Sequence, residues 1–303
     1  MDSTVVGGVT TLIAVGEVRM AGRAKGVVGI EDMAIAAQRW YENFRPSGVK
    51  VHAGAPVIEH GMVEQDFKDL AEAGVTLLGE VGLGTVKDGK TAQQMVGWAR
   101  KYGIQSTIHT GGPSIPGSGL IDADMVIETG TDVIGHINGG HSALPDDQII
   151  CLCESCSSAF EIVHNGNERS AVLALNTARE LGKLDQIILG TDGPAGSGVQ
   201  PLGIMRMVAM LSAFGNVPAE KAFCFCHGNN SRRRNLDTGL IKAGYAADFV
   251  LLDKAQHAPG KTMLESVQLG NLPGVGMTVI DGEVTSGRSR NTPPADRLPE
   301  HIK

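Results

Sequence analysis

The chain is poor in aromatic residues, in charge and in long apolar runs. Of its 303 residues, 4% are aromatic and 19% are charged, and the formal net charge is −7. Nucleic acids and anionic membranes attract basic proteins, so this balance argues against both as partners. The longest apolar stretch, residues 5–16, is interrupted by Thr10 and Thr11 and is too short to span a bilayer. The chain starts MDS, without the basic start of a secretory signal, so we expect a cytoplasmic protein.

A disulfide framework is not expected either. Five cysteines is an odd number, and no secretory signal accompanies them. The cysteines at 151, 153, 156, 224 and 226 also lack the paired CxxC spacing of zinc sites. We therefore expect them to pack as small apolar side chains.

What the sequence does contain is a repeated alternation of short apolar runs with stretches of helical period. The runs lie at residues 9–15, 49–53, 75–81, 105–109, 132–136, 159–163 and 186–189. Near-continuous apolar strands that alternate with helices are typical of parallel βα units. Seven such units over residues 1–235 predict a TIM-like (β/α)8 barrel that lacks its first strand, because a closed barrel needs eight. A doubly wound open sheet is the alternative that needs no further strand.

The pattern changes after about residue 235. Residues 239–253 and 277–285 read as short strands with turns, so residues 236–285 are predicted to form part of a small β-sandwich domain. Residues 286–303 are polar and rich in proline, which is typical of a tail draped over the surface. Three consecutive arginines at 232–234 are expected on a solvated helix face.

Four of the predicted strands end in residues that suit one kind of chemistry. Glu80 follows the third run, His109 the fourth, His136 the fifth and Asp192 the last. In parallel α/β proteins, functional groups gather at the carboxyl ends of strands. Two imidazoles and two carboxylates that meet there predict a site for borderline divalent metals.

The sequence resembles the amidohydrolase superfamily of metal-dependent hydrolases, and the likeness extends over nearly the whole chain. It is carried by GGVTT (7–11), GVKVHAGA (48–55), GEVGLGT (79–85), HTGGPSIPGS (109–118), HINGG (136–140), GTDGP (190–194), PLGI (201–204) and SRNTPP (289–294). The long segments are specific, whereas the GxIxxGxxAD pattern at 239–248 is widespread in the superfamily.

This resemblance implies a role for each strand-end residue. Glu80 would bridge two metal ions, His109 and His136 would bind the second ion, and Asp192 would bind the first and carry the proton. The pair would be zinc, iron or both, and would activate a water that opens a cyclic amide of the 6-oxo-1,4,5,6-tetrahydronicotinate type. The small-molecule substrate would be bound by a homo-oligomer, a tetramer by resemblance.

The resemblance is incomplete at one point. Superfamily members carry a His-x-His pair on the first strand, and none of the nine histidines here forms one. We therefore expect an N-terminally truncated family member in which full binuclear chemistry is impaired.

Four further residues are predicted to bind substrate. Gly111 and Gly112 lie in a glycine-rich loop whose backbone N–H groups could hold a carboxylate, and Ser114 belongs to the same loop. Asn138 belongs to the HINGG segment after the fifth run.

Two other functions compete with a hydrolase. Gly84 to Thr91 (GTVKDGKT) match the GxxxxGK[ST] pattern of a nucleotide-binding P-loop, between a predicted strand and a predicted helix. A non-catalytic remnant of an amidohydrolase is the other alternative, and the missing histidine pair favours it.

Overall fold

The computed structural model describes residues 2–15, 24–114, 117–140, 142–194, 198 and 201–300. Six parallel strands form its α/β part: β1 (Thr11–Ile13), β2 (Lys50–His52), β3 (Thr107–Ile108), β4 (Val133–Ile134), β5 (Ala159–Val163) and β6 (Ile187–Gly190). β1 pairs with β2, and β3 to β6 pair in chain order. The parallel α/β architecture predicted from the alternating runs is confirmed.

The third apolar run connects these two sheets without forming a regular strand. Leu77 bridges to Gln105 and Val81 to Ile108, both in parallel. On its other side, Gly79 donates a hydrogen bond of 2.8 Å to a backbone carbonyl oxygen beyond β2. A side chain at Gly79 would lie 2.8 Å from backbone oxygen, so glycine permits this close approach. The strand order predicted from the sequence is kept, although the regular ladder is interrupted here.

The outer edge of β6 is covered by asparagine side chains. Asn229 Nδ2 donates to the Ile187 carbonyl oxygen at 2.8 Å, and Asn230 Nδ2 donates to that of Leu189 at 3.1 Å. Both asparagines lie on α10 (Gly228–Arg233). Among the described residues β6 and β1 do not pair, so the hydrogen-bond ladders do not close a cylinder.

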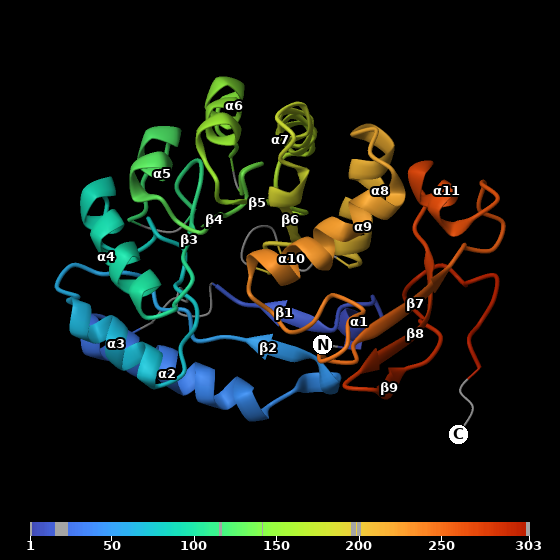
Figure 1. Ribbon diagram of the computed structural model, residues 1–303, viewed down its shortest axis with the longest axis horizontal. Coiled ribbons are helices and arrows are strands. Elements are labelled where there is room, and N and C mark those ends of the chain that lie inside the picture. The colour runs from blue at the N-terminus through green and yellow to red at the C-terminus, as the bar shows by residue number, and fades with distance from the viewer. Residues whose placement is uncertain are drawn as a thin grey trace.

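Helices surround the parallel strands (Figure 1). They are α2 (Val27–Asn43), α3 (Glu64–Glu72), α4 (Gly89–Lys101), α5 (Ala123–Thr129), α6 (Asp146–Ser155), α7 (Glu168–Glu180), α8 (Gly203–Phe214) and α9 (Ala219–Cys226). Asp88, Asp122 and Asn167 cap α4, α5 and α7 by accepting a backbone N–H of the first turn. Among the described residues no helix combines the length and apolar character needed to cross a bilayer.

The main hydrophobic core lies between the strands and these helices. Phe67, Phe160 and Phe225 are completely buried in it. Burying a large apolar side chain such as phenylalanine contributes about 1.5–3 kcal/mol to the free energy of folding. The continuous apolar strands provide many buried apolar side chains. This packing fixes the strands, and with them the positions of the loops at their carboxyl ends.

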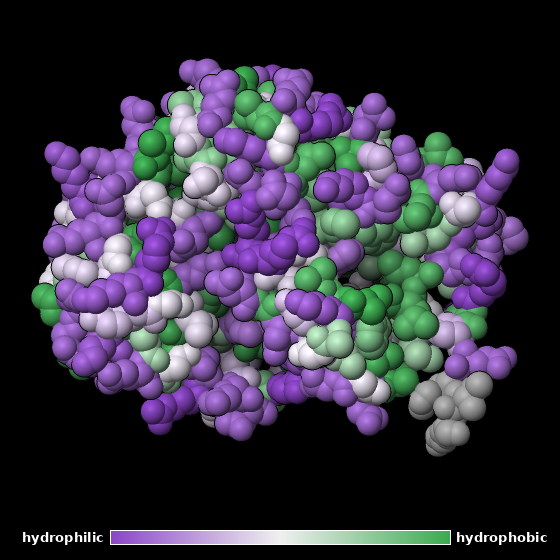
Figure 2. All heavy atoms as spheres, viewed as in Figure 1, coloured by the Kyte–Doolittle hydropathy of each residue, from purple (hydrophilic) through white to green (hydrophobic). Residues whose placement is uncertain are grey.

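A third sheet follows the barrel-like part. β7 (Phe249–Asp253), β8 (Gly274–Ile280) and β9 (Glu283–Ser286) form three antiparallel strands, with α11 (Met263–Gln268) between the first two. Thr278 donates its hydroxyl to the Val5 carbonyl oxygen at 3.1 Å, which ties β8 to the short helix α1 (Asp2–Val5). Figure 2 shows hydrophobic side chains gathered on this face where α1 meets the small sheet.

The polar segment after β9 runs along this sheet. Ser289 N–H donates to the Val275 carbonyl oxygen at 2.9 Å, and Val275 N–H donates to Thr292 Oγ1 at 3.0 Å. Farther along, Arg297 Nε lies 2.8 Å from Asp253 Oδ2. Residues 289–297 therefore extend the interactions of β7 and β8.

Candidate metal centre

Three of the four predicted ligands meet at the carboxyl ends of neighbouring strands. Glu80 follows the irregular third run, His109 follows β3, and His136 follows β4. Each is 2% exposed. One ligand atom from each lies within 4.8 Å of the other two, as in a site that could hold a metal ion. Parallel strands that end at one edge bring together residues 56 positions apart in the chain, from Glu80 to His136.

The distances in this cluster suit a small cation. His136 Nε2 lies 3.4 Å from Glu80 Oε1, and His109 Nδ1 lies 3.9 Å from Glu80 Oε2. Ligands of a tetrahedral zinc ion, at about 2.1 Å from the metal, are about 3.4 Å from each other. The two imidazole rings stand at 77° with centroids 4.6 Å apart, so they approach edge-on rather than stack. The residues present therefore fit a divalent ion held by two nitrogens and a carboxylate.

Outer contacts orient both imidazoles toward that position. His109 Nε2 lies 2.9 Å from the Gly112 carbonyl oxygen, and this hydrogen bond requires a proton on Nε2. In the neutral imidazole Nδ1 then has no proton and can bind a metal ion through its lone pair. Thr110 Oγ1 lies 3.5 Å from His136 Nδ1 and donates to the His136 carbonyl oxygen at 2.9 Å. Such outer contacts fix the ring orientation of metal-binding histidines.

Two of the predicted ligands have a strained backbone. His136 has φ 30° and Asp192 has φ 52°, in the left-handed region that residues with a side chain rarely adopt. Strained residues of this kind persist where the surrounding structure holds them, and they cluster at functional sites.

Asp192 lies beside the cluster, next to Gly140. A Cβ added to Gly140 would lie 3.6 Å from Asp192 Oδ2 and 3.9 Å from His136 Cε1. Gly140 thus leaves room between the carboxylate and the imidazole. Asp192 is partly exposed and is not one of the three residues whose ligand atoms meet.

The electrostatics of the site favour positive charge. Burial lowers the pKa of His136. The hydrogen bond and charge of the Glu80 carboxylate, with smaller contributions from the charges of Asp192 and Glu161, outweigh burial and raise that pKa above its usual value. The field that holds a proton on the imidazole would equally attract a divalent cation.

The predicted substrate loop is engaged within the protein. Gly111 donates its N–H to the Ile121 carbonyl oxygen at 3.0 Å, and Gly112 donates its N–H to Ser142 Oγ at 3.1 Å. These N–H groups therefore do not form the open carboxylate cradle expected from the sequence, because the loop pairs them internally. Ser114 Oγ is buried and has no hydrogen-bond partner among the described residues.

Asn138 is also occupied by backbone. Its Nδ2 donates to the Val163 carbonyl oxygen and its Oδ1 accepts the Val163 N–H, both at 2.9 Å. The amide thus ties the loop after β4 to the end of β5. The structure does not bring it to the cluster as the predicted substrate contact.

One arginine of the run departs from the expected solvated face, whereas Arg232 is exposed as expected. Arg234 has a side chain only 2% exposed, and its Nη2 lies 2.9 Å from Glu161 Oε1. Its Nη1 also lies 3.2 Å from Thr107 Oγ1, two residues before His109 on the same face of the sheet. A charge run gives no sign of this, because burial here depends on where α10 ends.

The P-loop pattern does not form a phosphate site. Asp88 Oδ1 accepts the Thr91 N–H at 2.8 Å, so a carboxylate of the chain itself caps the start of α4. A Cβ at Gly84 would lie 2.0 Å from the Ile58 carbonyl oxygen, so this glycine serves close packing. The nucleotide-binding alternative is therefore not supported.

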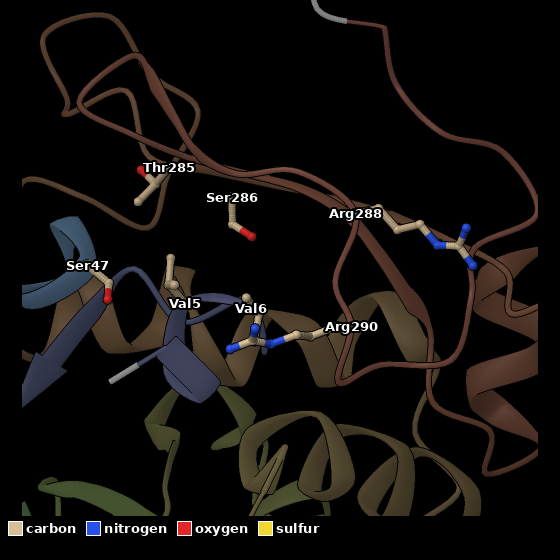
Figure 3. Close-up of a pocket in the computed structure, with 7 residues that line it drawn as sticks. All are labelled: Val5, Val6, Ser47, Thr285, Ser286, Arg288 and Arg290. Atoms are coloured by element: carbon tan, nitrogen blue, oxygen red, sulfur yellow. The ribbon is translucent and has the colours of Figure 1, made fainter.

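A cavity of about 450 Å³ lies away from these strand ends (Figure 3). Val5 and Val6 of the N-terminal segment face Thr285 and Ser286 across it, and Arg290 also lines it. It therefore belongs to the border between the N-terminus and the small sheet.

The parallel fold and the strand-end cluster define a hydrolase of the amidohydrolase family. Residues 4–285 match the sequence model of that family, and the chain belongs to it.

The chain is similar to an enamidase from Eubacterium barkeri, with 40% identity over 297 residues, 98% of this chain and 77% of that protein. The crystal structure of an enamidase superposes with a TM-score of 0.94 at 40% identity, covering the same shares of both chains. A β-aspartyl dipeptidase from Fervidobacterium islandicum shares the fold at a TM-score of 0.62 and 14% identity, covering 97% of this chain and 79% of that one. The superfamily resemblance found in the sequence is confirmed.

Proposed function

We propose that the chain hydrolyses the amide bond of a cyclic enamide of the 6-oxo-1,4,5,6-tetrahydronicotinate type. The observation that carries the proposal is the meeting of Glu80, His109 and His136, buried at adjacent strand ends, in a chain 40% identical to an enamidase. None of the described contacts favours a non-catalytic remnant, since these three side chains are oriented toward one point.

The proposed metal is zinc or iron. Imidazole nitrogens suit both ions, and both also accept a carboxylate oxygen beside them. A divalent ion held there would polarise the amide carbonyl and lower the pKa of a water molecule. Glu80 Oε, His109 Nδ1 and His136 Nε2 would hold it, and Asp192 would complete the set.

Asp192 has a second role in this proposal, as the proton carrier. Its carboxylate would take a proton from the attacking water and give it to the ring nitrogen as the amide C–N bond breaks. Water thereby supplies oxygen to the carbonyl carbon and hydrogen to nitrogen. The released enamine tautomerises to an imine, and a second water converts that imine to an aldehyde and ammonia.

Two neighbouring residues would position the reactants. Thr110 would keep His136 in its strained conformation through the hydrogen bond to the His136 carbonyl oxygen. Ser114 Oγ, buried and without a partner among the described residues, would donate to the substrate carboxylate.

The test compares the chain with two glutamate variants. Metal-depleted protein is given zinc or ferrous iron, and the ammonia that is released serves as the measure of ring opening. We expect activity with a bound ion, and loss of both the ion and the activity in Glu80→Gln. Glu59→Gln is the matched control, because Glu59 is also buried but accepts the Thr85 N–H, which a glutamine oxygen can still do. A chain that binds neither ion, or a Glu80→Gln variant that keeps its metal, would refute the proposal.

A further inference from the structure

The loop after β5 reaches across to the strand end that carries Asp192. Asn165 Nδ2 donates to the Asp192 carbonyl oxygen at 3.0 Å and lies 3.4 Å from the Gly198 carbonyl oxygen. The two contacts are to carbonyl oxygens, so the amide nitrogen faces them. Asn165 N–H also donates to the Thr191 carbonyl oxygen at 3.2 Å, which extends the β5–β6 pairing to this corner.

Asp192 needs such support because its backbone is strained. At φ 52° a residue with a side chain adopts the left-handed conformation only when its surroundings hold it there. The direction of its Cα–Cβ bond depends on this conformation. The Asn165 bond acts on the Asp192 carbonyl group, the part of the backbone that would turn if the residue relaxed to an ordinary conformation.

The position of the carboxylate follows from that backbone. Asp192 Oδ2 and the His136 ring lie near the same point, 3.6 and 3.9 Å from the position that a Cβ of Gly140 would occupy. A turn of the Asp192 backbone would move the carboxylate away from His136, and so from the cluster.

We infer that Asn165 is a positioning residue that holds Asp192 in its left-handed conformation, with the carboxylate toward His136 and the metal. This inference rests on the proposed function, in which Asp192 helps to bind the ion and carries the proton. Asn165 acts only through Asp192 and touches neither the ion nor the reacting atoms.

A second asparagine of the same loop provides a matched comparison. Asn167 Oδ1 accepts the Ser170 N–H at 3.0 Å and caps α7, and its side chain makes no described contact with Asp192. The two asparagines are two positions apart in one loop, yet only Asn165 bonds the Asp192 backbone through its side chain.

The experiment is a double-mutant cycle on zinc affinity and turnover. The variants are Asn165→Leu, which keeps the size but removes the donor, Asp192→Asn, and the two combined. Zinc Kd is measured by competition with a chelating dye, so the cycle does not depend on activity. We expect Asn165→Leu to weaken zinc binding about tenfold and to lower kcat about tenfold with KM nearly unchanged. In the Asp192→Asn background it should change neither, because residues that act through one another are not additive.

The control and the opposing outcomes separate this inference from a structural effect. Asn167→Ala should lower Tm through the lost cap but leave zinc Kd and kcat unchanged. Equal losses from Asn165→Leu in both backgrounds, or no loss at all, would overturn the positioning role while leaving the proposed function intact. A parent chain that binds no zinc would overturn both. If the leucine variant does not fold, Asn165→Ala repeats the cycle with a smaller side chain.

Discussion

Two of the regions in which charged side chains meet are built in opposite ways. Where β2 joins the small sheet, Lys50 Nζ lies 2.9 Å from Asp248 Oδ2 and 2.7 Å from Asp281 Oδ1, and Arg45 Nη2 lies 2.7 Å from Asp281 Oδ2. We call these four residues the seam. At the strand ends, by contrast, carboxylates gather with imidazoles.

The difference shows which region is complete in itself. In the seam, burial lowers the pKa of Lys50, but hydrogen bonds to Asp281 and Asp248 outweigh it and raise that pKa. The same bond to Lys50 lowers the pKa of Asp281. Cations and anions of the chain thus satisfy each other. The strand-end cluster instead brings together a carboxylate and two imidazoles that could all bind one divalent cation. In the proposed function that cation comes from solution.

The largest expected effect concerns metal removal at the strand ends. Zinc at about 1,000 times its Kd should raise the free energy of unfolding by about 4 kcal/mol, because it binds only the folded chain. His109→Ala should abolish this rise, since it removes one of the two imidazole ligands. Urea unfolding with zinc and with a chelator measures both, and a full zinc effect in the variant would contradict the assignment of the cluster.

The seam should respond to mutation without any change in metal binding. Lys50→Met leaves Asp248, whose side chain is 1% exposed, without its cation. Removing one partner of a buried pair costs about 3 kcal/mol, so the variant should unfold at clearly lower urea concentration. Its zinc-induced stabilisation should equal that of the parent chain, and a smaller one would show that the two regions are coupled.

A smaller effect is expected from the residue that orients His136. Thr110→Val removes the hydroxyl that contacts both the ring and the carbonyl group of His136. Loss of such an outer contact weakens metal binding by about tenfold or more. Dye competition measures the zinc Kd, and Thr238→Val, which removes a hydroxyl contact to Asp248 in the seam, is the control that should leave it unchanged.

The smallest effect is a pH dependence at the end of β7 that lies farther from the seam. The bond from the Arg297 side chain lowers the pKa of Asp253 to about 2. The pKa of an aspartate in the unfolded chain is about 3.9. The stabilisation by the Arg297–Asp253 bond is therefore present above that pH and is lost as the pH falls toward about 2. Arg297→Gln should therefore be less stable than the parent at pH 7, and the difference should shrink between pH 4 and pH 2. Urea unfolding across that range tests the sign, and a difference that grows with acid would contradict it.

The sequence predicts the strand-end ligands because the reason is local and periodic. Each ligand follows an apolar run, and parallel strands end at a common edge, so Glu80, His109 and His136 could be placed together without coordinates. The irregular third run was harder to predict, because its interruption depends on how closely the neighbouring backbone approaches Gly79.

The remaining features depend on contacts between distant parts of the chain. Gly112 donates its N–H to Ser142, thirty residues away, and Arg234 donates to Glu161. Asn165 bonds Asp192 twenty-seven residues later, and no motif or spacing marks it. Such pairings arise only once the loops fold against each other.

The two asparagines of α10 have a consequence for how the protein behaves in a crowded solution. A bare strand edge offers a row of backbone groups on which another polypeptide can align, and this is a common beginning of aggregation. On β6, two amide side chains already occupy the carbonyl oxygens of Ile187 and Leu189. A side chain can end a row of hydrogen bonds but cannot continue it, so this border of the sheet offers no template for growth at those two carbonyls.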